Sequence, residues 1–171
     1  MPKAFFLVLL ELLLLGALAF PSQADDCKSV VVAVTDGDSL ILAQGQNREK
    51  VILYGIDCPE TQQAFGAEAK AFTNSACYRK TVGVNMHGKD SRGRTIAEIF
   101  LPDGSSLNRE LVKHGLAWWS DKYAPQDKEL QSLQSEARAG KIGLWAGLNP
   151  IAPWIFRNGE KSVKAEIKSG N

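Results

Sequence analysis

Two short runs of β-branched residues joined by an Asp-Gly turn limit the fold of this chain more than any other feature. The stretch KSVVVAVTDGDSLILA predicts strands at about residues 28–34 and 39–43, because Asp-Gly between apolar runs is a strong hairpin signal. Asp36 and Asp38 then lie in or beside the turn. A second turn, GQNRE, leads to the run KVILYGI at residues 50–56. The simplest topology is therefore an antiparallel meander of three strands.

Helical and strand patterns alternate in the remainder of the chain. The alanine-rich stretch QAFGAEAKAFTNSACYR predicts a helix from about residue 64 to residue 78 with one apolar face. The runs KTVGVNM and TIAEIFL predict a fourth and a fifth strand, joined by the polar loop HGKDSRGR. SLNRELVKHGLAWW predicts a short helix that Gly115 ends. PQDKELQSLQSEARAGKIGLW predicts a longer one, which Pro125 opens near its first turn and Gly140 closes.

This order of elements predicts an α+β fold that is mainly β. Five strands, interrupted by one helix and followed by two further helices, indicate a small closed barrel that the helices cap. Closure is favoured because it removes exposed strand edges. The length of 171 residues suits one such domain.

The first 24 residues are typical of a secretory signal. Lys3 supplies a basic start, an apolar run follows, and SQA forms a small-residue cleavage site that ends at Ala24. An uncleaved membrane anchor is the alternative, since the run is only a little shorter than the ~20 residues that span a bilayer. Glu11 within the run favours cleavage. We expect a secreted or periplasmic protein without stable membrane contact, with its domain at 25–157 and a mobile tail at 158–171.

Charge and cysteine content limit the kinds of site that are expected. The net charge is +1, so no global field attracts a polyanion and any nucleic-acid role must depend on a local site. Cys27, Cys58 and Cys77 lack the close paired spacings of a zinc site, and an exported chain permits a disulfide. Cys27 with Cys77 is one pairing; the alternative is that Cys77 is a small buried apolar residue.

Three carboxylates are placed so that they could meet at one end of the barrel. Asp38 follows the first turn, Asp57 ends the third strand, and Glu60 lies three residues further on. Pro59 disfavours a helical conformation at Cys58, which leaves the Cys58 carbonyl available as an oxygen ligand. Carboxylates and a carbonyl suit calcium better than zinc or copper. The alternative is that these acids bond their own turns or cap the following helix.

The loop KDSRGR contains a candidate for anion binding. Gly93 lets the backbone approach a ligand closely, and Arg94 begins the next strand. A guanidinium is a planar fork that matches the geometry of phosphate. The alternative is that Arg94 is a solvated surface charge.

Taken together, these segments resemble the staphylococcal-nuclease-like, or thermonuclease, family. The resemblance covers about residues 28–157 and rests on six segments in the family's order: VTDGDSL, YGIDCPE, FGAEAKAF, DSRGRTIAEI, LNRELVKHGLAW and GLWAGLNPIAPW. It implies a five-stranded OB-fold barrel with three helices that hydrolyses phosphodiester bonds in DNA or RNA, with Ca²⁺ as its cofactor.

The resemblance also implies a role for each candidate residue. Asp38 and Asp57 would hold Ca²⁺, with the Cys58 carbonyl assisting. Glu60 would act as a general base on a water molecule, and Arg94 would bind the phosphate and stabilise the leaving oxygen. These residue types fit the chemistry, because calcium polarises a phosphoryl oxygen and a guanidinium neutralises the charge that grows on the phosphate.

One position departs from the family's pattern. Family members usually carry a second arginine five residues before the metal-binding aspartate, where this sequence has Ile52. Loss of one preorganised donor to a developing oxyanion typically lowers the rate by ~10² to 10³. We therefore expect a nuclease of reduced activity, and the alternative is a catalytically impaired nucleic-acid-binding or scaffold module. Lys50, roughly 6.6 Å along the strand, and Arg92 are candidates to contact substrate in place of this arginine.

Aromatic residues after the second helix are candidates for base stacking. Trp118, Trp119 and Tyr123 cluster there, and stacking tolerates any base. The alternative is that the tryptophans pack helices onto the barrel. We expect a monomer whose substrate is DNA or RNA that is single-stranded or locally open. A less favoured class is a non-catalytic surface protein that binds peptide or glycan.

Overall fold

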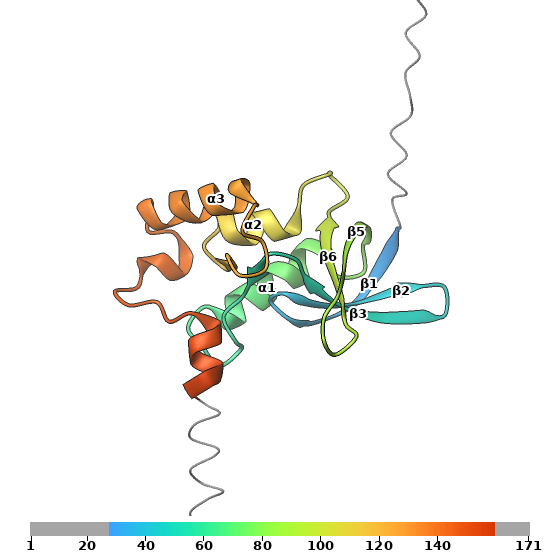
Figure 1. Ribbon diagram of the computed structural model, residues 1–171. Helices are drawn as coiled ribbons and strands as arrows, with labels where there is room; N and C mark the ends of the chain where they lie inside the picture. Colours follow the sequence, from blue (N-terminus) through green and yellow to red (C-terminus); the bar gives the residue numbers. More distant parts are fainter. Residues whose placement is uncertain (1–27, 160–171) are drawn as a thin grey trace, which may run out of the picture.

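The computed structural model describes residues 28–159, in which five strands close into a barrel (Figure 1). The strands are β1 (Ser29–Asp36), β2 (Ser39–Gln44), β3 (Asn47–Leu53), β5 (Thr81–Lys89) and β6 (Thr95–Phe100). They follow the order β1-β2-β3-β6-β5, and the pairing of β1 with β5 closes the barrel. The predicted α+β class and five-stranded OB-fold barrel are confirmed.

The first three strands form the predicted antiparallel meander. Asp36 pairs with Ser39 across the first hairpin, and Ser39 pairs in turn with Ile52 of β3. β3 pairs with β6 in parallel, so that Val51 lies opposite Thr95. This parallel pair brings the start of β6, directly after the polar loop, beside the last residues of β3.

The predicted third strand is interrupted before it reaches Asp57. β3 ends at Leu53, and a separate strand β4 (Ile56–Asp57) pairs with β7 (Trp118–Trp119) in a small second sheet. Gly55, between them, has a φ of 73°, a left-handed conformation that glycine adopts without steric cost. The chain therefore turns at Gly55, and Asp57 lies outside the barrel wall.

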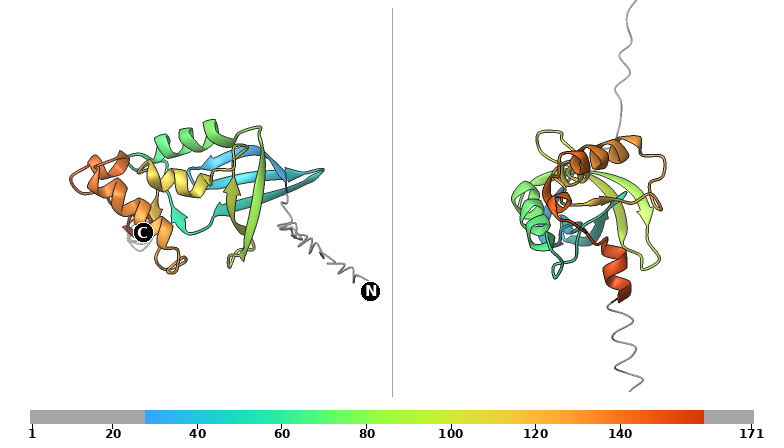
Figure 2. Two further views of the ribbon diagram at one scale, coloured as in Figure 1. Left: turned by 90° about the horizontal axis from the view of Figure 1, so that it is seen from above. Right: turned by 90° about the vertical axis from the view of Figure 1, so that its left-hand side faces the viewer.

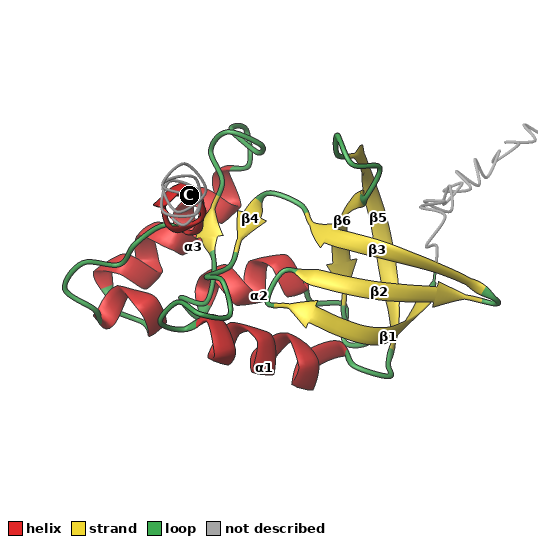
Figure 3. Cartoon of the chain, turned by 90° about the horizontal axis from the view of Figure 1, so that it is seen from below, coloured by secondary structure: helices red, strands yellow, loops and turns green. Residues whose placement is uncertain are grey.

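Three α-helices lie at one end of the barrel, opposite the tip of the β2–β3 hairpin (Figures 2 and 3). They are α1 (Gly66–Cys77), α2 (Leu107–Lys113) and α3 (Lys128–Ala139), and a 3₁₀ helix, η1 (Gly143–Ala146), and a helical segment at 153–159 follow. α3 begins later than predicted. Its N-cap is Asp127, whose side chain accepts a hydrogen bond from the backbone N–H of Leu130, whereas Pro125 precedes the helix.

One apolar core fills the barrel and continues beneath the helices. Its fully buried large side chains are contributed by β1, β2, β3, β5, β6, α2 and α3: Val31, Leu40, Val51, Leu53, Val82, Ile99, Leu107, Leu111, Val112 and Leu130. Asn108 of α2 is the buried polar residue at the centre of this packing. Its Oδ1 accepts a hydrogen bond from Ile99 N (3.1 Å), and its Nδ2 donates to the Tyr54 carbonyl (2.8 Å). Asn108 thereby holds the chain at the point where β3 leads to β4.

The predicted signal at 1–24 and most of the predicted tail lie outside the described residues, as does Cys27. Cys58 and Cys77 are free, buried thiols, and Cys77 donates a hydrogen bond to the Thr73 carbonyl. Within residues 28–159, no helix is both long enough and apolar enough to cross a bilayer.

We predict that Asn108→Ala lowers the free energy of unfolding by about 2 to 4 kcal/mol, because it leaves a buried N–H and a buried carbonyl without their partner. Urea denaturation measures this loss. Asn85→Ala, at an exposed position on β5, is the matched control and should change stability by less than about 0.5 kcal/mol. Equal effects of the two substitutions would contradict the structural role of Asn108.

Candidate active site

The β1–β2 turn places Asp38 against the segment that follows β4. Asp38 Oδ2 accepts a hydrogen bond from the Cys58 backbone N–H (3.0 Å), and the Asp38 carbonyl accepts one from Leu53 N (2.9 Å). Asp38 Oδ1 accepts a third from the Ser39 hydroxyl (3.1 Å). The structure therefore brings Asp38 together with the Asp57–Cys58 peptide.

Gly37 permits this close approach. A β-carbon at Gly37 would lie 2.8 Å from the β-carbon of Cys58 and 2.9 Å from that of Ala69, which is closer than packed carbon atoms come. The Gly37 carbonyl accepts a hydrogen bond of 2.6 Å from the buried Thr73 hydroxyl of α1. The turn is thus held between the Cys58 segment and α1, with no space for a side chain.

A tight loop positions Glu60 after Pro59. The side chain of Gln63 accepts a hydrogen bond from Glu60 N (2.8 Å), and the Glu60 carbonyl accepts one from Gln63 N (2.7 Å). Gly66, at the start of α1, packs so closely that a β-carbon there would lie 1.9 Å from the Glu60 carbonyl oxygen. These contacts fix the backbone of Glu60 and leave its carboxylate half-buried at the surface.

Negative charge accumulates around Asp38. Burial raises the pKa of Asp38 from 3.8 to about 6, and the neighbouring carboxylates of Asp57 and Asp36 raise it further, against the lowering effect of the hydrogen bond from Cys58. Burial raises the pKa of the Cys58 thiol well above its ordinary value, and the charge of Asp38 and its neighbouring acids raises it further, which keeps the thiol protonated at neutral pH. The corner is therefore suited to bind positive charge.

The positive charge that fills this corner is Arg157, a residue for which the sequence predicted no role. Its two terminal nitrogens bind both oxygens of Asp57 (3.0 and 2.7 Å), and Nη1 also donates to Glu60 Oε1 (2.6 Å). Arg157 comes from the helical segment at 153–159, drawn in red in Figure 1. The sequence feature that could have indicated this segment is the run APW at residues 152–154, which is apolar enough to anchor it to the domain.

Comparison with known proteins identifies the family of this chain. A family model described as staphylococcal nuclease homologue matches residues 50–147, which is more than half of the chain. This chain belongs to the staphylococcal nuclease family. Membership confirms the predicted family and the predicted enzyme class, a nuclease that hydrolyses phosphodiester bonds.

Three similar relatives are bacterial. A protein of Haemophilus influenzae named an uncharacterized endonuclease is 41% identical over 132 residues, which cover 77% of this chain and 73% of the relative. A protein of Escherichia coli with the same name is 34% identical over 146 residues (85% of this chain, 95% of the relative). A micrococcal nuclease of Shigella flexneri is 30% identical over 147 residues (81% and 84%).

Staphylococcal nuclease homologues are metal-dependent, and the donor set of this corner fits a hard cation. Asp38 and Asp57 offer carboxylates on either side of the Cys58 backbone, and oxygen donors of this type are those that calcium prefers. Among residues 28–159, no three His, Cys, Asp or Glu side chains are arranged to hold a metal ion by themselves. Both oxygens of Asp57 accept hydrogen bonds from Arg157, so a cation at Asp57 would compete with the charge of this arginine.

The cationic residues that the sequence predicted for the site lie away from Asp38, Asp57 and Glu60. Arg94 is bonded to Asp90, with Nε and Nη2 each 2.6 Å from Oδ2, and no nitrogen of Arg94 lies within ion-pair distance of Asp38, Asp57 or Glu60. The backbone N–H of Arg92 also donates to Asp90. These two arginines therefore sit in a loop that their shared aspartate organises.

The β3 positions of the predicted site are now placed. Ile52 is half-buried between Ser39 of β2 and Ile96 of β6, one residue in register from Asp38. Lys50 is exposed and pairs with Ile41, two residues further from the acids along the strand. Neither residue places a cation at the corner.

The tryptophans after α2 pack the helices, which was the alternative to base stacking. Trp118 makes edge contacts with Trp145 (4.4 Å between ring centroids) and Trp154 (5.6 Å). Trp119 Nε1 donates to the Ala124 carbonyl (3.0 Å). Tyr123 is 67% exposed and remains available for contact with a ligand.

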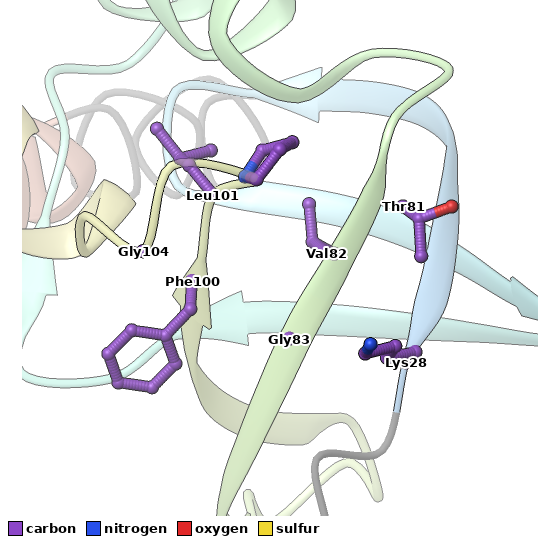
Figure 4. A pocket seen from close by; sticks show the side chains of 8 residues that line it. Lys28, Thr81, Val82, Gly83, Phe100, Leu101 and Gly104 are labelled. Atoms are coloured by element: carbon purple, nitrogen blue, oxygen red, sulfur yellow. The ribbon is translucent and has the colours of Figure 1, made fainter.

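One hollow of the described residues lies elsewhere and contains none of the acids. It measures about 410 Å³ and is lined by residues at the starts of β1 and β5 and the end of β6, of which Lys28 is the charged member (Figure 4). Without acids or arginines, it offers no groups for phosphodiester hydrolysis.

We predict that Asp38→Asn raises the free energy of unfolding at pH 8, with chelator present. The folded-state pKa of Asp38 is raised, so its contribution to stability is complete below about pH 4 and is lost as the pH rises through 6. Asparagine cannot ionise, so the variant should be more stable than wild type at pH 8 by up to about 3 kcal/mol, and no more stable at pH 4. Urea denaturation at both pH values measures the difference.

The exposed Asp103 provides a control of opposite sign. Hydrogen bonds from Ser105 hold the pKa of Asp103 below its ordinary value, so Asp103→Asn should slightly destabilise the protein at pH 8. If Asp38→Asn changed the free energy of unfolding equally at pH 4 and pH 8, the pKa of Asp38 would not be raised in the folded state.

Proposed function

We propose that this staphylococcal nuclease homologue is an exported, calcium-dependent nuclease that hydrolyses single-stranded or locally open DNA or RNA without strong sequence preference. The observation that carries the proposal is the hydrogen bond from Cys58 N to Asp38, which joins the first hairpin to the segment of Asp57 and Glu60. The names endonuclease and micrococcal nuclease of the relatives support the activity. The sequence pattern of residues 1–24, which predicts a secretory signal, supports export.

In this proposal the acids divide into two roles. Asp38, Asp57 and the Cys58 carbonyl hold the calcium ion, which supplies Lewis-acid polarisation of a phosphoryl oxygen when bound. Glu60, whose backbone the Gln63 loop fixes, takes a proton from the attacking water and needs no covalent intermediate. Asp57, the Cys58 carbonyl and Glu60 lie on one short segment, so the same backbone sets both roles, whereas Asp38 comes from the first hairpin.

The phosphate requires guanidinium groups, and Arg94 is the proposed one. Its present partner is Asp90, a partly buried acid four residues earlier, so Arg94 must exchange Asp90 for phosphate when substrate binds. The phosphate replaces the carboxylate as an anionic partner with matching geometry, which offsets the loss of the ion pair. Lys50, Arg92 and Tyr123 lie on exposed surface and are proposed to contact more distant parts of the substrate.

The rival function is a nucleic-acid-binding barrel that has lost cleavage. Two observations favour it: Ile52 supplies no charge on β3, and Arg157 fills the corner that a cation would enter. Both proposals predict nucleic-acid binding, so cleavage with and without metal discriminates between them.

We predict that purified protein digests single-stranded DNA in calcium and loses this activity in EGTA. Asp57→Asn should reduce cleavage at least about 100-fold, because it removes a charged ligand of the cation. Asp121→Asn, at an exposed acid outside the corner, is the matched control and should retain activity. Cleavage that persists unchanged in EGTA would overturn the metal role.

We also predict that Ile52→Arg raises the cleavage rate about tenfold or more, because it adds a fixed guanidinium donor beside Asp38. Ile52→Gln, which adds length and polarity without charge, serves as the control and should not raise the rate. Initial rates on a fluorescent single-stranded oligonucleotide measure the change. Absence of cleavage in wild type and in both variants would favour the binding module.

A further inference from the structure

The ion pair of Arg157 joins residues that are far apart in the chain. Its partners Asp57 and Glu60 lie 100 and 97 residues earlier. Arg157 binds Asp57 through both terminal nitrogens, the bidentate geometry in which guanidinium and carboxylate interact most strongly. Two hydrogen bonds from one fork to one carboxylate fix the orientation of the guanidinium plane.

The segment that carries Arg157 is anchored to the domain. Ala152 is buried, the ring of Trp154 contacts Trp118, and Gln63 Nε2 donates to the Ile151 carbonyl (3.1 Å). Gln63 is the same residue that fixes the backbone of Glu60. The loop of the proposed base and the segment of the arginine are thus held by one side chain.

This contact can contribute to folding, because it is bidentate and joins three charged groups. The side chain of Arg157 is nevertheless 40% exposed, so solvent and ions reach the contact. The contact also changes the corner, because Arg157 occupies a lone pair on each oxygen of Asp57 and its positive charge opposes a divalent cation there. A cation at Asp57 therefore competes with Arg157, whose anchored segment keeps the guanidinium nearby when it is displaced.

A guanidinium released from Asp57 would lie beside the position that the scissile phosphate must take. A guanidinium stays charged at all physiological pH values, so Arg157 keeps its positive charge when it leaves the acids. It starts 2.6 Å from Glu60, the proposed base, and the phosphate must lie within one water of that carboxylate. Because position 52 is isoleucine, no arginine at this position of β3 competes with Arg157 for the phosphate. Arg94 is bonded to Asp90 in this structure.

We propose that Arg157 is a phosphate-binding residue of this site, which rests on Asp57 and Glu60 until cation and substrate arrive and then transfers to the phosphate. The proposal rests on the proposed function, because it assumes that Asp57 takes part in cation binding. It assigns to the C-terminal segment the guanidinium that β3 lacks.

The first test measures calcium binding by calorimetry without nucleic acid. Arg157→Ala and Arg157→Lys should each bind Ca²⁺ more tightly than wild type, by about fivefold, because neither can hold Asp57 through a fork. The lysine variant keeps the charge, so a gain in both variants identifies direct competition. Arg48→Ala, which removes a charge from the exposed β2–β3 hairpin, should leave calcium affinity unchanged. Unchanged affinity in both Arg157 variants would overturn the proposal.

The second test measures phosphate contact. In calcium, Arg157→Ala should weaken binding of a phosphorothioate oligonucleotide that resists cleavage, and should lower kcat/KM on normal DNA by about 10². Arg157→Lys should lose less. If Arg157→Ala bound calcium more tightly but cleaved DNA as fast as wild type or faster, the arginine would be only an inhibitory counter-ion and the phosphate role would be wrong.

A double variant separates this proposal from the proposed function. If both arginines bind the same phosphate, Ile52→Arg should raise kcat/KM more in the Arg157→Ala background than in wild type. Equal gains in the two backgrounds would show that Arg157 does not bind the phosphate that an arginine at position 52 would bind. If wild type cleaves nothing, the nuclease proposal fails alone, and calcium and oligonucleotide affinities still decide the role of Arg157.

Discussion

The hydrogen bond between the Cys58 N–H and Asp38 is the interaction on which the rest of the site depends. Two β-hairpin residues and a loop of the second sheet meet there only because Gly37 has no side chain to keep them apart. A side chain at position 37 would push the turn away from Cys58 and separate Asp38 from Asp57, although neither carboxylate is changed. A position with no functional group of its own therefore determines whether the acids share one environment.

This close approach creates an electrostatic problem that the rest of the corner answers. Burial raises the pKa of Asp38 and the neighbouring Asp57 raises it further, while a guanidinium from the far end of the described chain binds Asp57. A site that must accept a cation and a phosphate anion in turn needs groups that can exchange partners. Arg94 on Asp90 and Arg157 on Asp57 are both ion pairs with partly exposed arginines, so neither is held irreversibly.

Local patterns predicted most of the fold, because the barrel strands follow short-range rules. The Asp-Gly hairpin, the meander and α1 were predicted close to their observed positions, and the acids were predicted to lie near one another. The break at Gly55 was missed, since the run KVILYGI is uniformly apolar and its interruption depends on the pairing of β4 with β7, some 60 residues later. A two-residue strand has no periodicity of its own.

Arg157 was missed for a related reason. Nothing within ten residues of Arg157 resembles an active site, and its partners are defined only by tertiary contact. In contrast, Arg94 was predicted from a glycine-containing loop, a local signal, but its pairing with Asp90 depends on the conformation of that loop. Sequence reasoning thus identified which charges are present, and only the structure shows which of them are paired.

The position of Arg157 has a consequence for biosynthesis. A ribosome releases Asp57 about a hundred residues before it releases the arginine that binds it, and the barrel strands end at Phe100, well before that point. β7, which pairs with the strand of Asp57, also leaves the ribosome before Arg157 does. Asp57 and Glu60 therefore gain their guanidinium partner only after the rest of the described domain has been made.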